Sequence, residues 1–553
     1  MIGGAIGSVG RPQQRTQSVM RYPAPLMGID TRKSLTTGDL NNCVYTFNLC
    51  PFEFGLRCRS GFREWQIAVD AGIGAGVHTL IPFDSIQDSG GGDKLFAVTN
   101  EGIWDTTVYA AAPVKVATFT DTSADAGYGT FTHYVNQAED DVLFYADNLN
   151  GLWSYDAGLN AWTQGNVIDA GQPITDADVK FVMSHKNNVW FAAQNSTIGY
   201  YLPILANQGV VTEQFFGDKF GHGGTLEGLF SWTVDGGDGV DDILVAVSHA
   251  GDVILYTGSG PDEADWGMKG IYYIGQIPNT PRFGSEQGGE LYLLSAYGIV
   301  SMSDLLSGVD SNTLQADVEG NSIALKISGL LRQEMREKIT LRGWDVSVVP
   351  AEGGIVVSTP TVGAEAPIQF YYNLATRGWG LWRNVPMTCF TEWEGAVMFG
   401  TADNRVQRMD DVLDNVVITP EAGTENGEPI GFSIMTSYSP LSGDGTYKRV
   451  KLIRPDFIST TKPTFSSQAR YDFDTSEAFD FATSDPNALA VGVWDLGAWD
   501  NVIWASKNGT TFPTIAGAWG TGRYIAVATA GTCRADTRLI GWDVIFDAGG
   551  TMI

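Results

Sequence analysis

The sequence predicts a mainly β fold: a β-propeller of six or seven blades between an extended N-terminal arm and a C-terminal antiparallel β-sandwich-like domain. Three observations lead to this prediction. Glycine accounts for 67 of the 553 residues and aromatic residues for 11%, which is typical of short strands joined by tight turns. A hairpin pattern recurs through the middle of the chain, and the segments on either side lack it. The predicted boundaries are 1–65 for the arm, 66–411 for the propeller and 412–553 for the sandwich.

The arm is predicted from its lack of periodicity and from its prolines and basic residues. Such a segment lies extended on other surfaces, and a partly disordered tail is the alternative interpretation. Because basic residues are scarce in this acidic chain, those of the arm are candidates for docking on acidic surfaces of partner proteins. They are Arg11, Arg15, Arg21, Arg32 and Lys33.

The propeller is predicted from repeated hairpins, each an apolar strand, a turn rich in Gly, Asn or Asp, and a second strand beginning with apolar or aromatic residues. Seven such hairpins begin at Leu95, Val142, Val189, Ile243, Leu291, Ile355 and Val397. Their starts are 42 to 64 residues apart, which is the spacing of propeller blades. A β-solenoid has a shorter period, and a string of sandwiches lacks this regularity.

One helix and a different C-terminal pattern complete the predicted elements. Apolar residues at mixed helical spacing and a charged face predict a helix over 322–339, packed on a β surface. From residue 412 onward the apolar segments are longer and are separated by acidic loops, which favours an antiparallel sandwich.

The charge balance excludes several functions. The chain has 34 Lys and Arg against 63 Asp and Glu, a net charge of −29. This argues against a protein that grips nucleic acid and against binding to acidic membranes. No apolar stretch reaches the roughly 18 residues of a membrane-spanning helix, and the N-terminus does not resemble a secretory signal. Five cysteines in a long chain predict reduced thiols and assembly in a cytoplasm.

Motifs for catalysis or cofactor binding are not found in the sequence. No two histidines have metal-ligand spacing on a helix, and neither a nucleophile elbow nor a phosphate loop occurs. We therefore expect no catalytic site and no cofactor. Four carboxylates beside flexible glycines are weak candidates for calcium ligands, namely Asp235, Asp238, Asp241 and Asp242. Their spacing does not fit the EF-hand pattern, so we interpret the segment as a solvated acidic turn.

A resemblance to a known family rests on residues near the N-terminus. The chain reads GIDTRKSL from Gly28, with Arg32 and Leu35, and then follows N-x-x-P-x-x-x-G-L-x-x-R-x-G-[FY]. The second pattern is set by Asn48, Pro51, Gly55, Arg59, Gly61 and Phe62. This opening resembles that of tail nozzle proteins of short-tailed bacteriophages, also called tail tubular protein B or packaged-DNA stabilisation protein. Segments starting at Tyr447, Trp494 and Leu539 are similar to the far end of the same family.

The resemblance implies a structural virion protein of the phage tail, assembled in the host cytoplasm and without catalysis. Several copies, typically six, would form a tapering tube below the portal and adaptor rings, with a fibre, spike or needle protein as a further partner. The tube retains packaged DNA and later conducts it without specific binding. Acidic groups within a Debye length of the DNA would repel its phosphates. The alternatives are a propeller that binds or cleaves glycans and a propeller scaffold for protein partners.

Overall fold

The computed structural model describes residues 17–36, 38–66, 76–85, 92–235, 240–308, 322–360, 362–363, 367–419, 426–441, 446–477, 510–513, 516–518 and 520–548. These residues are mainly in strands and form two compact units. The propeller unit is drawn from residues 29–32 and 58–430. The sandwich unit is drawn from residues 1–28, 33–57 and 431–553.

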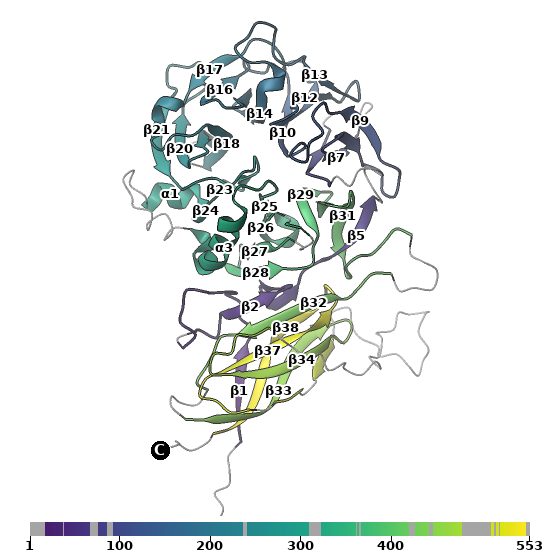
Figure 1. Cartoon of the computed structure of the whole chain (residues 1–553), viewed down its shortest axis with the longest axis vertical. Coiled ribbons are helices and arrows are strands. Elements are labelled where there is room, and N and C mark those ends of the chain that lie inside the picture. The colour runs from purple at the N-terminus through teal and green to yellow at the C-terminus, as the bar shows by residue number, and fades with distance from the viewer. Residues whose placement is uncertain are drawn as a thin grey trace, which may run out of the picture. The chain divides into compact units, whose positions relative to one another are not determined.

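Seven antiparallel sheets make up the described part of the propeller unit, and we number them as blades 1 to 7. They follow one another around a ring, from β7 and β9 through β17 and β21 to β31 and β5 (Figure 1). Blades 1 and 2 consist of β6 (Thr79–Phe83), β7 (Lys94–Thr99), β8 (Gly102–Asp105), β9 (Val114–Thr118), β10 (Gly129–Val135), β11 (Asp141–Asp147), β12 (Gly151–Asp156) and β13 (Ala161–Gln164). The mainly β, propeller-type fold is therefore as predicted.

Blades 3 and 4 also have four strands each in the described residues. They consist of β14 (Val179–His185), β15 (Asn188–Ala193), β16 (Ile198–Tyr201), β17 (Thr212–Phe215), β18 (Leu226–Asp235), β19 (Val240–Ser248), β20 (Asp252–Thr257) and β21 (Gly267–Tyr273). Two short 3-10 helices lie in this part of the chain, η1 (Asp176–Asp178) and η2 (Gly217–Lys219). All adjacent strands within these blades pair antiparallel.

Blades 5 to 7 complete the ring. They consist of β22 (Gly284–Gln287), β23 (Glu290–Ser295), β24 (Gly298–Ser301), β25 (Asp345–Val349), β26 (Gly354–Ser358), β27 (Gln369–Asn373), β28 (Gly378–Trp382), β29 (Met387–Trp393), β30 (Ala396–Thr401), β31 (Val406–Asp411) and β5 (Gly61–Gln66). The 3-10 helix η4 (Pro350–Glu352) joins β25 to β26. Each of the seven predicted hairpins is present as paired strands.

The α-helices of the described residues are few and follow blade 5. The helix predicted over 322–339 begins as the 3-10 helix η3 (Ile323–Ile327) and continues as α3 (Ser328–Lys338). Its buried face carries Leu331 and Met335, as expected for a helix packed on a sheet. A shorter helix that was not predicted, α1 (Met302–Gly308), follows β24. No helix of the described residues is long and apolar enough to cross a membrane.

The core between blades is aromatic. Phe96 of blade 1 meets the rings of Tyr155 and Trp162 of blade 2 at centroid distances of 5.0 and 5.3 Å, edge to face. Phe181 of blade 3 meets Phe230 of blade 4 in the same way at 5.8 Å. Large rings fill the gaps between twisted sheets and add favourable edge contacts.

The sandwich unit contains two antiparallel sheets in the described residues. One has β3 (Leu49–Phe52), β4 (Gly55–Cys58), β38 (Arg538–Ala548), β33 (Lys448–Ser459) and β35 (Thr510–Pro513) in that order, with β1 (Gln17–Pro23) beside β38 and β36 (Ala516–Gly517) beside β33. The other has β2 (Cys43–Phe47), β32 (Ile430–Thr436), β37 (Ile525–Cys533) and β34 (Thr464–Tyr471). Rings of Phe432, Phe457 and Phe465 join the two sheets.

The N-terminal region differs from the predicted extended arm. Its described residues form β1 to β5, and these strands take part in both units. β1 pairs with β38 near the end of the chain, and β5 pairs with β31 to complete blade 7. Periodicity did not reveal β1, β2 and β5 because each is a single strand whose partners lie hundreds of residues away. The unit boundaries consequently differ from 1–65, 66–411 and 412–553.

Candidate functional site at the propeller axis

The first strand of each blade lies nearest the propeller axis. Neighbouring first strands contact one another from β6 through β10, β14, β18, β22 and β25 to β29, and β29 returns to β6. Polar residues at and before the starts of these strands therefore converge on the axis. This is where the structure gathers the groups of a candidate site.

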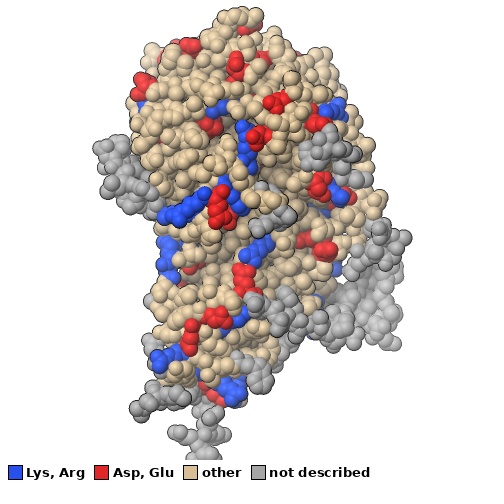
Figure 2. Space-filling model, viewed as in Figure 1, with Lys and Arg blue, Asp and Glu red and all other residues tan. Residues whose placement is uncertain are grey.

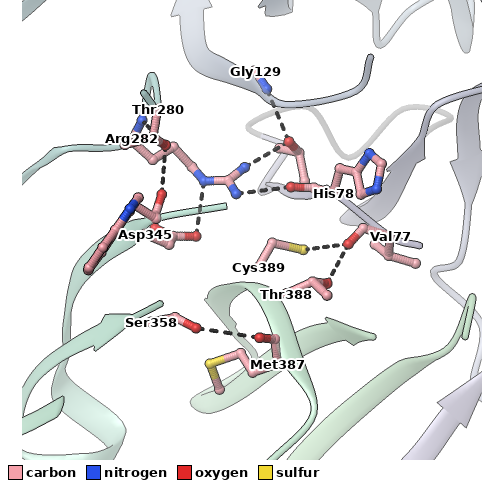
Figure 3. Close-up of polar contacts among 12 residues, drawn as sticks. Val77, His78, Gly129, Thr280, Arg282, Asp345, Ser358, Met387, Thr388 and Cys389 are labelled. Carbon is pink, nitrogen blue, oxygen red and sulfur yellow. Dashed lines mark hydrogen bonds and ion pairs between the residues drawn. The ribbon is translucent and has the colours of Figure 1, made fainter. Parts of the chain in front are cut away.

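Arg282, which directly precedes β22, is the centre of a buried polar network (Figure 3). Its Nη1 donates to Thr79 Oγ1 at 2.7 Å and its Nη2 to the His78 carbonyl oxygen at 2.9 Å. Its Nε lies 2.9 Å from Oδ2 of Asp345, and the two side chains are 13% and 3% exposed. Because these partners belong to blades 1 and 6, the guanidinium ties blade 5 to both.

The same network holds further contacts across the axis. The Thr79 hydroxyl donates to the Gly127 carbonyl at 2.7 Å, and the Trp344 carbonyl accepts a hydrogen bond from the Thr280 hydroxyl at 2.6 Å. The carbonyl of Val77 accepts from Thr388 Oγ1 at 2.5 Å and from the Cys389 thiol at 3.5 Å. These bonds satisfy polar groups that would be costly to bury alone.

Burial shifts the pKa of several groups in this network. Desolvation lowers the pKa of His78 to about 4, so the imidazole is neutral near pH 7. Desolvation also raises the pKa of the Cys389 thiol to about 12. The pKa of Asp345 is raised by burial, against which the charge of Arg282 acts. The charge of Arg282 therefore favours the ionised form of the Asp345 carboxyl and offsets part of the cost of its burial.

Two cavities lie along the axis, and Pro281 lines both. The first, which we call the Arg282 cavity because Arg282 is among its lining residues, has a volume of about 280 Å³. Among its lining residues are Phe131, Phe181, Phe230 and Glu286. The Glu286 carboxylate accepts a hydrogen bond from the Ser231 amide at 2.7 Å. It remains reachable by water through the open cavity, yet partial desolvation raises its pKa to about 7.

The second, which we call the polar cavity, has a volume of about 260 Å³. Its wall is rich in amides, hydroxyls and charged groups. It is lined by Tyr128, Asn148, Lys180, Asn195, Thr225, Glu227, His249, Asn279, Thr280, Pro281 and Arg342. Such convergence of polar groups in a concave site is typical of ligand pockets.

The residues of the N-terminal pattern occupy structural positions. Asn48 has a φ of 61° and donates from Nδ2 to the Gly431 carbonyl at 2.7 Å. Gly55 has a φ of 135°, and a Cβ there would lie 2.7 Å from the Leu539 carbonyl oxygen. Both residues bring the chain close to another strand of the sandwich unit.

The second half of the pattern lies in the propeller unit. Arg59 binds both carboxylate oxygens of Asp414, at 2.7 and 2.6 Å. A Cβ on Gly61 would lie 2.2 Å from the Leu413 carbonyl oxygen, so β5 can approach that segment only with glycine. Phe62 is buried and packs edge to face on Phe399 at 5.4 Å.

The remaining pattern residues have simpler surroundings. Gly28 donates its amide to the Pro25 carbonyl and accepts from the Cys43 amide. Pro51 is buried in β3, and Leu35 is partly buried. Arg32 pairs with Asp30 at 3.3 Å.

The described calcium candidates lie where β18 ends and β19 begins. Asp235 ends β18, Asp241 and Asp242 lie in β19, and Asp238 lies outside the described residues. Asp242 accepts a hydrogen bond from the Thr233 hydroxyl at 2.8 Å. Across the described ranges, no group of three or more His, Cys, Asp or Glu residues has a metal-binding arrangement.

The basic docking candidates differ in their surroundings. Arg21 lies in β1 and pairs with Asp543 at 3.0 Å and with Asp456, so its charge is used within the sandwich unit. Lys33 is exposed. Arg11 and Arg15 lie outside the described residues, as does the segment from Trp494. All five cysteines are buried thiols.

Comparisons with known proteins add little to this geometry. No family model matches the chain, and no curated protein matches it. Among solved structures, a candidate 6-phosphogluconolactonase of Bacteroides uniformis is 13% identical with a TM-score of 0.30, covering 59% of this chain and 88% of that one. The extracellular domain of a candidate hybrid two-component system of B. thetaiotaomicron is 13% identical with a TM-score of 0.40, covering 88% of this chain and 58% of that one.

A Bacteroides caccae protein of unknown function is 10% identical with a TM-score of 0.24, covering 41% of this chain and 72% of that one. Because all three TM-scores are below 0.5, the fold is defined here by the pairing of the strands and not by similarity to these structures. The chain is a β-propeller protein with a second, sandwich-like unit built from both ends of the sequence.

Sequence reasoning missed the axis residues, above all Arg282, Glu286 and Arg342. They belong to no motif and are far apart in the sequence. One signal was present in the sequence. Residues 92–300 hold only seven Lys or Arg against 26 Asp or Glu, and Arg282 is the single arginine among them. An isolated arginine in such an acidic region suggests a specific partner.

Proposed function

We propose that this chain is the tail nozzle subunit of a short-tailed bacteriophage, a structural protein whose copies form a ring-shaped tube for packaged DNA. The observation that carries the proposal is the role of the shared N-terminal pattern. Asn48, Gly55, Arg59 and Gly61 are required by close backbone approaches and by a buried ion pair. Because the fold requires these residues, the N-terminal pattern reports on the fold. We therefore expect this chain to have the same architecture as the tail nozzle proteins whose opening it resembles.

The propeller axis itself is not the DNA passage in this proposal. The two axial cavities have volumes of about 280 and 260 Å³, which suits small molecules. The Arg282 and Asp345 ion pair also crosses between blades at the axis. The passage would instead be enclosed by several copies arranged around a common axis.

The charge distribution fits a conduit that does not hold DNA by attraction. The seven basic and 26 acidic residues of 92–300 have a net charge of −19. On the face drawn in Figure 2, acidic and basic side chains are scattered over a surface that is mostly uncharged. A wall of this kind offers phosphates few attractive contacts, because nucleic-acid affinity depends on neutralisation by Lys and Arg.

Glycan cleavage, the alternative function, has less support. Among the described residues, the lining of the Arg282 cavity includes one carboxylate, Glu286, and that of the polar cavity includes one, Glu227. The common mechanisms of glycoside hydrolysis use a pair of carboxyl groups in one site. Neither cavity wall supplies such a pair.

The proposal is tested by assembly on a purified portal and adaptor complex. We expect the chain to be a monomer alone and to form a ring of about six copies on this template by electron microscopy and mass measurement. Lys33→Glu should weaken attachment to the template. Arg336→Glu, at an exposed position of α3, should not. A chain that stays monomeric with the template would contradict the proposal.

The docking role of the first residues is tested by a deletion that ends before β1. Because β1 begins at Gln17 and pairs with β38, removal of 17–20 would damage the sandwich unit. Deletion of residues 2–15, which include Arg11 and Arg15, leaves β1 intact. Normal incorporation of this variant into particles would show that the basic segment does not dock.

A further inference from the structure

The polar cavity contains an arginine without a counter-ion. Among the residues that the structure describes, no carboxylate forms an ion pair with Arg342, which lines this cavity. The other basic groups share one carboxylate, because Glu227 Oε2 lies 3.1 Å from Lys180 Nζ and 3.7 Å from His249 Nδ1. Arg342, Lys180 and Glu227 together therefore give the wall one positive charge in excess.

This excess is unusual in its surroundings. Lys180 is one of only seven basic residues in 92–300, where acidic residues number 26. The Lys180 side chain is 10% exposed and Glu227 is 16% exposed, so both charges are poorly hydrated. An anion that entered the cavity would contact charge-assisted donors in a site partly screened from water, where such bonds are strongest.

Neutral hydrogen-bonding groups surround these charges. Asn148, Asn195 and Thr225 line the wall and can each both donate and accept. Tyr128 stacks on His78 with ring centroids 4.2 Å apart and an angle of 12°, which holds its ring in place. Desolvation raises the pKa of Tyr128 to about 12, so its hydroxyl keeps its proton at neutral pH and can donate.

We propose that the polar cavity binds a small anionic sugar, a monosaccharide that bears one carboxylate or one phosphate. The anionic group is bound by Arg342 and Lys180, and the sugar hydroxyls are bound by Asn148, Asn195 and Thr225. A volume of about 260 Å³ is somewhat smaller than the roughly 300–1,000 Å³ of drug-sized ligand pockets and suits a single sugar. This site uses none of the residues on which the proposed nozzle role depends.

The test is isothermal titration of the full chain with four probes: glucose 6-phosphate, glucuronate, glucose and inorganic phosphate. We expect at least one anionic sugar to bind about tenfold or more tightly than glucose, because one charge-assisted bond contributes this much. It should also bind more tightly than inorganic phosphate. Equal binding of glucose and both anionic sugars, or no binding of either anionic sugar at 10 mM, would overturn the proposal.

Matched variants locate the site. Arg342→Gln should weaken binding of the anionic sugar about tenfold or more, whereas Arg336→Gln, which removes an exposed arginine of α3, should change it less than about twofold. Asn148→Asp places a second carboxylate in the wall and should weaken binding similarly without removing a cation. If circular dichroism shows Arg342→Gln to be unfolded, Asn148→Asp decides the question, and wild-type affinity in that variant would contradict the assigned site.

Discussion

Arg59 and Asp414 form the most deeply buried ion pair of the N-terminal pattern. The side chain of Arg59 is 0% exposed and that of Asp414 is 9% exposed. Two parallel hydrogen bonds of 2.7 and 2.6 Å join them. Burial raises the pKa of Asp414, and the hydrogen bond and charge of Arg59 oppose this shift. Arg59 thus offsets the free-energy cost of burying the Asp414 carboxylate.

Arg59→Met should therefore destabilise the propeller unit by about 3–5 kcal/mol, because it leaves Asp414 buried without its partner. The measurement is denaturant unfolding followed by tryptophan fluorescence. Arg63→Met is the control, since Arg63 and its partner Asp410 are 35% and 30% exposed, and such pairs contribute about 1 kcal/mol or less. Similar losses in the two variants would contradict the assigned role.

His78 makes stability depend on pH. Its pKa is about 4 in the folded protein, against 6.5 for an unperturbed histidine, so the unfolded chain binds a proton at higher pH. The stability that His78 contributes is present above pH 6.5 and is lost as the pH falls towards 4, by about 3 kcal/mol in all. Between pH 7 and pH 5 the loss is about 2 kcal/mol.

His78→Asn should remove this dependence, because an asparagine amide can still donate to the Ala126 carbonyl that His78 Nδ1 contacts at 2.8 Å. The variant should lose about 2 kcal/mol less than the wild type between pH 7 and pH 5 in denaturant unfolding. His249→Asn, at a side chain that is 43% exposed, is the control. Parallel pH profiles for wild type and His78→Asn would refute the prediction.

At the scale of elements, β5 decides how the propeller closes. It comes from the N-terminal region but forms the last strand of blade 7 beside β31. Because β5 and β31 come from distant parts of the chain, their pairing closes the ring at blade 7. The ring can open there only if this pairing is broken. Gly61, at the start of β5, allows the contact with Leu413.

Gly61→Ala should destabilise the propeller unit by about 1–3 kcal/mol, since the added methyl group meets backbone rather than a movable side chain. Thermal unfolding measures the effect. Gly431→Ala in β32 is the matched control, because a Cβ there meets nothing within 4 Å. A Tm for Gly61→Ala equal to that of the control would show that β5 shifts without cost.

The outer strands of three blades expose large apolar side chains. Val114 of β9, Phe215 of β17 and Met268 of β21 are 61%, 57% and 46% exposed. Large apolar groups that are exposed on outer strands are candidates for protein contacts. Phe215→Asp should therefore reduce ring formation on the adaptor template several-fold, whereas Val19→Asp in β1, also exposed at 66%, should have little effect. Mass photometry of the assembled particles measures both.

At the scale of the whole molecule, the net charge of −29 opposes self-association. Because salt screens repulsion beyond about 10 Å at 0.1 M, template-dependent ring formation should become more complete between 50 and 300 mM NaCl. Light scattering at equal protein concentration measures this. A decrease over the same range would mean that attraction between opposite charges, rather than apolar contact, holds the copies together.

Much of the fold could be predicted because its signals are local. Apolar residues and turn residues within each hairpin specify the paired strands, as at Leu95 and Val397. The axial site could not be predicted, because Arg282 meets His78 and Asp345 only after seven blades have closed into a ring. Arg342 gives no local pattern at all, and its importance comes from its having no carboxylate in an ion pair with it among the residues that the structure describes.

The amino-acid sequence by itself determined the β class, the repeated hairpins, the helix after blade 5 and the acidic character, since each depends on neighbouring residues or on composition. Only the tertiary structure decided that β5 closes the propeller, that β1 joins β38, and that Arg342 and Lys180 meet in one cavity. The physical reason is the same in each case: partners separated by hundreds of residues are chosen by the closure of the whole ring and sandwich, which no local pattern encodes.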